Sequence, residues 1–279
     1  MAFGSFSIFF SLALVFVIIT CPTSHSIPFI LLHGLNDQCS NEGVRDFTEY
    51  LTATSGAEGH CLEIGNGEMD SWFMPLEDQI QIICDKVKTM EQLRKGYNIV
   101  AMSQGNLVGR GVVEFCEGGP PVKNFISIAG PHAGVASIPQ CGSAFFCLVV
   151  DEMIKSVVYT DAVQNLLAPA TYLKLPNFEN DTILIPKETS WFGFYPDGNF
   201  DVVLPPQQTK LYMEDWIGLR SLAESGRVKF IKVEGEHLRM STSDIRRYVV
   251  PYLQHQPLKV LWWRPQKTQQ RTSNLLQSN

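Results

Sequence analysis

Short, almost wholly apolar runs alternate along this chain with longer segments whose apolar residues recur every three or four positions. The runs at 27–32, 97–102 and 122–129 have the length and composition of buried strands. Apolar residues at 76–90 repeat at helical spacing, and Pro75 stands where that helix would begin. Because strands that alternate with helices build parallel sheets, the pattern predicts an α/β fold, with a mostly parallel sheet and helices on both faces. Further predicted elements are helices at 41–54, after Gln104, at 215–225 and at 245–253, and strands at 61–64 and 228–233.

The beginning of the chain has the layout of a secretory signal peptide. An uncharged start leads into an apolar core at 6–19, and the small residues Ser24 and Ser26 suit cleavage before Ile27. This core is short for a membrane span, with a signal anchor as the alternative, and no other run approaches about 18 apolar residues. We therefore expect a protein of the secretory pathway without a stable transmembrane segment after cleavage. Its expected parts are a signal peptide at 1–26, one domain at 27–253 and a poorly ordered polar tail at 254–279.

The segment at about 135–178 departs from the alternation of strands and helices and is predicted to be a helical insert. Residues 145–167 are apolar and helical in character. Such an insert after a strand suits a cap over an apolar binding site, and a plain packing helix is the alternative.

Cysteine content and net charge indicate the cellular compartment of the protein and the classes of partner that it can bind. Six cysteines remain once Cys21 leaves with the signal, and an even number in an oxidising lumen predicts disulfides, although spacing alone does not choose the pairs. The formal net charge of −6 argues against a nucleic-acid partner. Because the cysteines and histidines lack zinc-site spacing, we expect no metal. Asn180 begins an Asn-Asp-Thr triplet and is a candidate glycosylation site.

A strand that turns directly into a helix around a serine is the main chemical signal. Ser103 follows the apolar run at 97–102, Gln104 opens a helical pattern, and Gly105 comes two residues after the serine. This arrangement is typical of a nucleophile elbow, in which flanking residues must be small so that strand and helix do not collide. The first small position is Ala101, where glycine is usual. The N–H of Gln104, at a helix N-terminus, is a candidate oxyanion donor.

The order of the polar residues that follow the predicted strands predicts a catalytic triad. A serine nucleophile needs a base and an orienting carboxylate, and in an α/β-hydrolase these follow in the order Ser, acid, His. Of the six histidines, only His237 follows a predicted strand and comes late enough to be the base. Asp181 is our choice for the acid. Rivals for the acid are Asp197, Asp201 and Asp215.

The second oxyanion donor is expected after the first strand. There His33-Gly34-Leu35 would place the N–H of Leu35 beside that of Gln104, with Gly34 allowing close approach of the backbone. Such a site needs no cofactor.

Several short motifs occur in one order along 28–253. They are His33-Gly-Leu-Asn-Asp37, Leu62-Glu-Ile-Gly65, Gly96-Tyr-Asn98, Met102-Ser-Gln-Gly105, Asn124-Phe-Ile-Ser-Ile128, Asn180-Asp-Thr182, Ser190-Trp-Phe-Gly-Phe-Tyr195, Leu211-Tyr212, Asp215, Gly218-Leu219 and Glu234-Gly-Glu-His-Leu238. Together they resemble the palmitoyl-protein thioesterases, lysosomal α/β-hydrolases that remove long acyl chains from cysteine. The resemblance implies an α/β-hydrolase with a helical cap, acting on S-acylated proteins or peptides or on acyl thioesters in the lysosome or vacuole lumen or outside the cell.

The resemblance also assigns roles to individual residues. It implies Ser103 as nucleophile, Asp181 as acid and His237 as base, with Leu35 and Gln104 at the oxyanion hole. Family disulfides match Cys84 with Cys116 and Cys141 with Cys147. Cys39 matches one of two adjacent family cysteines, and this leaves Cys39 with Cys61 as a hypothetical third pair.

One departure from the family pattern bears on activity. Family members have an additional stretch before the acid, which ends in an apolar strand, whereas residues 175–179 here run almost directly into Asn180-Asp181. Such a short segment containing Pro176 does not make that strand. Two alternatives to a thioesterase therefore stand beside it. One is a lipase or carboxylesterase with the same triad, and the other is a catalytically impaired acyl-binding protein.

Overall fold

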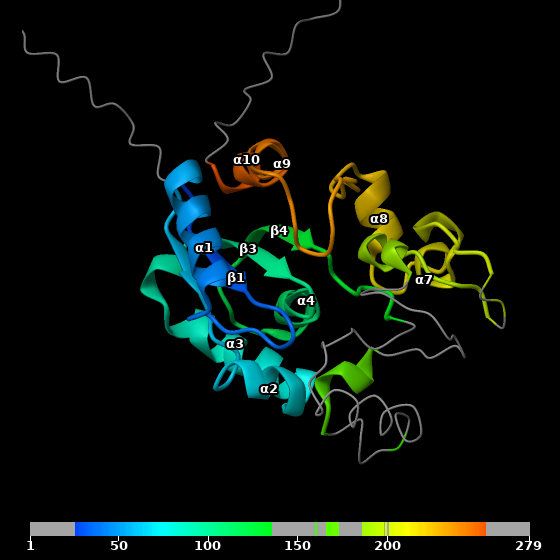
Figure 1. Cartoon of the computed structure of the whole chain (residues 1–279), viewed down its shortest axis with the longest axis horizontal. Coiled ribbons are helices and arrows are strands. Elements are labelled where there is room, and N and C mark those ends of the chain that lie inside the picture. The colour runs from blue at the N-terminus through cyan, green and yellow to red at the C-terminus, as the bar shows by residue number, and fades with distance from the viewer. Residues whose placement is uncertain are drawn as a thin grey trace, which may run out of the picture.

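A parallel sheet of four strands forms the centre of the protein (Figure 1). The computed structural model describes residues 26–135, 160, 166–172, 186–197, 199 and 201–254. The strand order is β2-β1-β3-β4, and each neighbouring pair is parallel. The predicted strand at 61–64 lies slightly earlier, at 59–61, so that His60 is in the strand rather than before it. The strands are β1 Phe29–Leu32, β2 Gly59–Cys61, β3 Tyr97–Met102 and β4 Val122–Ile128.

Helices cover both faces of this sheet, as the sequence pattern predicts (Figure 1). Consecutive residues of β3 point to opposite faces of the sheet. Ile99 packs in a core with Ile83 of α3 and Val108 of α4, whereas Val100 packs in a second core with residues of α1 and α10. Both faces of β1 and β3 are therefore buried. The helices are α1 Glu42–Ser55, α2 Glu68–Phe73, α3 Leu76–Thr89, α4 Gly105–Phe115, α7 Lys210–Met213, α8 Leu219–Glu224, α9 Thr242–Asp244 and α10 Val250–Leu253.

Short helical turns complete the described elements. A π-helical turn at Ile245–Val249 joins α9 to α10, and together they form the predicted C-terminal helix. The predicted helix at 215–225 begins only at Leu219, because Asp215 and Gly218 have the positive φ angles of 54° and 69°. The 3-10 turns are Glu91–Leu93, Ala168–Thr171, Lys187–Trp191 and Pro206–Gln208.

The predicted strand at 228–233 is not formed, and that prediction is wrong. Alternating side chains make a strand only if the backbone has a neighbour with which to pair. These residues form no ladder with β4, which is an outer strand of the sheet and is only partly buried. Instead, Lys229 Nζ lies 5.2 Å from the ring centre of Tyr252 in α10. The sheet therefore ends at β4 in the described part of the chain.

Several expectations lie outside the described residues. These are most of the signal peptide, the apolar segment at 145–167 apart from residues 160 and 166–167, and the tail from residue 255. Within the described residues, no helix is long and apolar enough to cross a membrane.

Candidate active site

Ser103 stands on a sharp turn between β3 and α4. Its φ angle is 47°, a left-handed conformation that costs free energy in a non-glycine residue and is found at nucleophile elbows. The turn also needs a small residue two positions later. A Cβ atom at Gly105 would lie 2.4 Å from the carbonyl oxygen of His33 and 2.6 Å from that of Leu32. The backbone of β1 therefore leaves room only for glycine at this position.

His237 approaches the serine from the loop before α9. Its Nε2 lies 3.2 Å from Ser103 Oγ, which is hydrogen-bond distance between two residues 134 positions apart. Gly235 and Leu238 flank the histidine with φ angles of 133° and 62°, so the loop turns tightly around it. Burial lowers the pKa of His237 below its usual 6.5. A neutral imidazole at this distance can accept the hydroxyl proton.

The N–H groups of Leu35 and Gln104 belong to the two turns that meet at the serine. A Cβ atom at Gly34 would lie 2.9 Å from Ser103 Cβ, which shows how closely the loop after β1 passes the nucleophile. Neither of the two N–H groups donates a hydrogen bond within the described part of the chain. They remain available to a negatively charged oxygen.

The side chain of Gln104 is held at both ends. Its Nε2 donates to the carbonyl oxygen of Ser71 at 2.7 Å, and its Oε1 accepts from the hydroxyl of Tyr172 at 2.8 Å. Burial raises the pKa of Tyr172, so this hydroxyl stays protonated and can donate. These contacts fix the first residue of the turn that opens α4. The sequence did not single out Ser71 or Tyr172, because neither belongs to a motif with catalytic spacing.

The loop after β1 is fixed just beyond Leu35. The N–H of Asn36 donates to Ser71 Oγ at 2.8 Å, and Asn36 Oδ1 accepts from the indole N–H of Trp72 at 2.9 Å. Both partners belong to α2, so this short helix holds the loop from one side.

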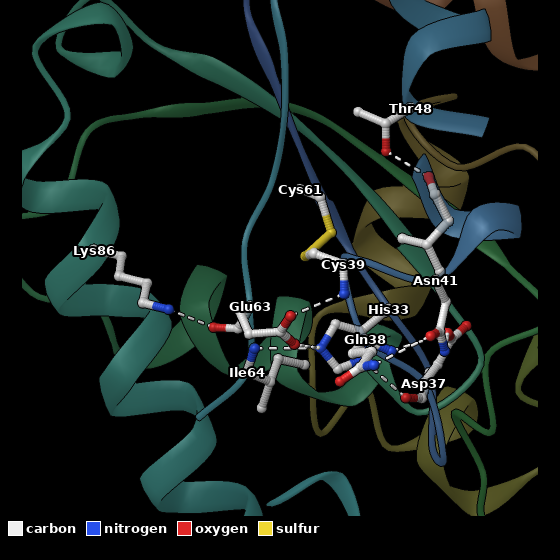
Figure 2. Close-up of a disulfide and its surroundings, with 12 residues drawn as sticks. His33, Asp37, Gln38, Cys39, Asn41, Thr48, Cys61, Glu63, Ile64 and Lys86 are labelled. Carbon is white, nitrogen blue, oxygen red and sulfur yellow. Dashed lines mark hydrogen bonds and ion pairs between the residues drawn. A yellow bond between two sulfur atoms is a disulfide. The ribbon is translucent and has the colours of Figure 1, made fainter. Parts of the chain in front are cut away.

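Two disulfides are present among the described residues, and both have the expected pairing. Cys39 is bonded to Cys61 and Cys84 to Cys116. The first joins the loop after β1 to the end of β2 (Figure 2). Cys141 and Cys147, the third expected pair, lie outside the described residues.

The candidate acid, Asp181, also lies outside the described residues, together with the glycosylation candidate Asn180. Two of its rivals have partners in their own region of the chain. Asp215 accepts hydrogen bonds from the N–H of Arg220 at 2.7 Å and from the hydroxyl of Ser221 at 2.5 Å. Asp197 pairs with Lys210 at 2.6 Å. The third rival, Asp201, is exposed, and its backbone N–H donates to Asn199 Oδ1.

The other buried histidines have separate partners. His132 Nε2 is 2.7 Å from Ser127 Oγ, and its ring stacks on Phe192 at 4.5 Å between ring centres. Burial, with a smaller effect of the Arg110 charge, lowers the pKa of His132 to about 3. The ring of His33 is fully buried and contacts Glu63. His237 is thus the histidine that the fold brings to Ser103.

A largely apolar cavity of about 360 Å³ lies between α1, the ends of β3 and β4, and the segment after His237, and neither Ser103 nor His237 belongs to its wall. Met102 and Leu238, the chain neighbours of Ser103 and His237, contribute to its wall. Its size falls within the range of small-molecule sites, about 300–1,000 Å³. Apolar side chains from α1, β4 and the C-terminal segment complete the wall, with a polar rim: Val44, Phe47, Ile128, Met240 and Ile245, and Asp37 and Asn41.

The described residues contain no group of three or more side chains that could hold a metal ion.

A sequence profile of the family described as "Palmitoyl protein thioesterase" matches residues 28–178 and 173–237. The chain belongs to this family. The two matched segments meet at 173–178, which overlaps the segment where the sequence departs from the family pattern. The elbow, the parallel sheet and its two helical layers identify the fold as that of an α/β-hydrolase.

Named relatives cover most of the chain. "Palmitoyl-protein thioesterase 1" of Caenorhabditis elegans is 30% identical in an alignment that covers 78% of this chain and 88% of the relative. "Palmitoyl-protein thioesterase 3" of Dictyostelium discoideum is 30% identical in an alignment that covers 88% of this chain and 98% of the relative. "Lysosomal thioesterase PPT2 homolog" of Drosophila melanogaster is 23% identical, and its alignment covers 81% of this chain and 91% of the relative.

Proposed function

We propose that this protein is a serine thioesterase that removes long-chain acyl groups, such as palmitoyl, from cysteines of S-acylated proteins or peptides. The observation that carries this proposal is the 3.2 Å contact between His237 Nε2 and Ser103 Oγ on a strained elbow. Membership of the thioesterase family supports the choice of substrate, as does the apolar cavity lined by Met102 and Leu238, the chain neighbours of the dyad.

The proposed reaction has two steps. Ser103 Oγ attacks the thioester carbonyl carbon while His237 Nε2 takes its proton, and the N–H groups of Leu35 and Gln104 stabilise the oxyanion. The C–S bond then breaks, and His237 returns the proton to the departing cysteine sulfur. In the second step water attacks the acyl ester, gives a proton to His237 and releases the fatty acid, and Ser103 regains its proton. Asp181 is the proposed orienting acid.

The compartment and domain limits belong to the same proposal. Two disulfides indicate the secretory pathway, and the name of the Drosophila relative supports a lysosomal or vacuolar lumen, with export from the cell as the alternative. We propose a mature hydrolase domain at 27–253 with a cap at about 135–178. A third disulfide between Cys141 and Cys147 and a glycan at Asn180 complete it.

A second function, acyl binding with impaired turnover, is favoured by one observation. The sheet ends at β4 in the described part of the chain, and residues 228–233, just before the His237 loop, form no strand. A base on such a loop depends on its orienting acid for the correct ring orientation, and loss of that partner costs on the order of 10⁴-fold in a serine protease.

Labelling with a fluorophosphonate tests the proposed function. We expect the purified protein to label at Ser103, and Ser103→Ala to abolish both labelling and hydrolysis of a palmitoyl thioester. Asp181→Ala should fold but label far more slowly. Thioester hydrolysis that persists in Ser103→Ala would contradict the proposal. A folded wild-type protein that binds palmitate but does not label would support the binding function instead. Faster cleavage of a matched oxygen ester than of the thioester would identify a lipase or carboxylesterase.

A further inference from the structure

The loop that connects β1 to α1 carries the candidate oxyanion donor Leu35 between two contacts to a single carboxylate (Figure 2). Glu63 Oε1 lies 2.7 Å from the Nε2 of His33, at the beginning of the loop. Glu63 Oε2 accepts a hydrogen bond of 2.9 Å from the backbone N–H of Cys39, near its end. The two oxygens of one carboxylate therefore lie against the chain on either side of Leu35. Oε2 accepts a hydrogen bond, whereas Oε1 pairs with His33 when the ring is protonated, because Nε2 must then donate rather than accept from the Ile64 N–H.

The contact with His33 reaches the backbone next to the donor. The ring of His33 is fully buried, so no solvent replaces a lost partner, whereas the Glu63 side chain is 30% exposed. The other ring nitrogen, Nδ1, lies 3.0 Å from the carbonyl oxygen of Gly34. That carbonyl belongs to the peptide group whose N–H is the donor of Leu35. The position of the imidazole and the orientation of this peptide are therefore linked.

The backbone of the segment that carries Glu63 is fixed by contacts with other elements. The backbone carbonyl of Glu63 accepts a hydrogen bond from Lys86 Nζ at 2.5 Å, which ties it to α3. Two residues earlier, Cys61 is bonded to Cys39, so the loop and the segment that carries Glu63 are also joined covalently. The N–H of Ile64 lies 3.3 Å from the same Nε2 of His33. A carboxylate on such a fixed segment is well placed to position the loop.

We propose that Glu63 is a positioning residue for the oxyanion donor at Leu35. It orients the Gly34–Leu35 peptide through His33 and fixes the return of the loop through the Cys39 N–H. This inference rests on the proposed serine-hydrolase function but not on the identity of the acyl group. A reacting or stabilising group that is misplaced by about 1 Å can cost on the order of 10²-fold in rate.

Three substitutions at Glu63 test this role against a matched control. Glu63→Ala removes both contacts, and Glu63→Asp keeps the charge but is too short to keep both. Glu63→Gln keeps the shape and removes the charge, since its amide oxygen can accept from the Cys39 N–H while its amide nitrogen faces His33 Nε2. The control is Lys86→Met, which removes the contact to the Glu63 carbonyl and leaves the carboxylate in place.

The readouts separate positioning from general stability. We expect Glu63→Ala and Glu63→Asp to lower kcat and the rate of fluorophosphonate labelling by about 10- to 100-fold. KM and the affinity for a non-hydrolysable thioether analogue should change by less than about twofold, because neither depends on an oxyanion. Glu63→Gln should restore most of the rate, and Lys86→Met, which keeps both carboxylate contacts, should lose far less rate than Glu63→Ala.

Two results would overturn the inference. One is a folded Glu63→Ala protein with intact disulfides that labels as fast as the wild type. The other is an equal loss of rate in Lys86→Met, which would assign the effect to the stability of the segment. The proposed function fails separately, if the wild type labels at Ser103 and cleaves a nitrophenyl ester but not a thioester. The Glu63 comparison is then made on the nitrophenyl ester.

Discussion

The two sides of the candidate dyad are held in different ways. Ser103 sits between a fully buried strand and a helix, and the loop facing it is tied to α2, to β2 and to Glu63. His237 sits on a loop that follows residues without regular structure, beyond the end of the sheet. The nucleophile and the oxyanion donors thus belong to a closed, cross-linked region, whereas the base depends on tight turns at Gly235 and Leu238.

Catalysis needs a correctly placed nucleophile with its oxyanion donors, and it needs a base within reach of that nucleophile. Different regions of this chain provide the two. Residues 27–135 contain the elbow, both candidate oxyanion donors and both described disulfides, and one face of their sheet packs on α10. The base is useful only if a separate segment brings it within reach of the serine. The 3.2 Å contact shows that it does so without a strand at 228–233.

The largest expected difference between the two regions is in stability. Ile99 is fully buried in β3, so Ile99→Ala should lower the free energy of unfolding by about 2–5 kcal/mol. Phe230 is 37% exposed in the segment before the base, so Phe230→Ser should cost less, about 1–2 kcal/mol. Denaturant unfolding of both variants measures this. Equal losses would mean that residues 228–233 pack as firmly as the sheet.

A smaller effect is expected at the elbow. Gly105→Ala would force a Cβ against the carbonyl oxygens of Leu32 and His33, and we expect a loss of about 1–3 kcal/mol with a matching loss of labelling at Ser103. Gly43→Ala is the control, because a Cβ there meets nothing within 4 Å and alanine favours the helix α1 by up to about 1 kcal/mol. If Gly105→Ala labelled like the wild type, the elbow would tolerate a larger residue than its geometry indicates.

The smallest predicted effect concerns the base. Burial lowers the pKa of His237, so its neutral form persists to lower pH than that of a free histidine. The acid limb of kcat/KM should therefore have its midpoint below about 6.5, and lowering the pH from 7 to 6 should cost less than about threefold. A pH profile of the purified protein measures this. A midpoint above 6.5 would contradict it and would indicate that a nearby carboxylate outweighs burial.

The fold class and the sharp strand-to-helix turn at Ser103 could be predicted from the sequence because their signals are local. The apolar run at 97–102, the serine that follows it and the helical spacing after Gln104 all act within one turn of chain. The strand at 228–233 could not be judged in this way. Its alternating pattern is also local, but a strand needs a neighbouring strand, and the described residues offer none beside 228–233.

The residues that hold the loop and the turn of the candidate site could not be predicted from the sequence, for a related reason. Glu63 was visible only as one letter of the Leu62-Glu-Ile-Gly65 motif, and Tyr172 carried no signal at all. Both act through contacts between distant positions, such as the bond from Tyr172 to Gln104 across 68 residues. A charged residue within the otherwise apolar run at 61–64 was the available indication for Glu63. Its role depends on the path of a loop, which residue spacing does not define.

The two described disulfides close between residues 39 and 116. If the chain enters the lumen from its N-terminus, all four of these cysteines arrive before His237 has been synthesised. At about 5–20 residues per second, the ribosome needs several seconds to extend the chain from Cys116 to His237, and disulfides can form on that timescale. The Cys84–Cys116 disulfide can therefore close the loop that contains Ser103 before His237 is present. With this order of assembly, Ser103 would have no general base until the last third of the chain is synthesised, and the growing chain would have no hydrolase activity before then.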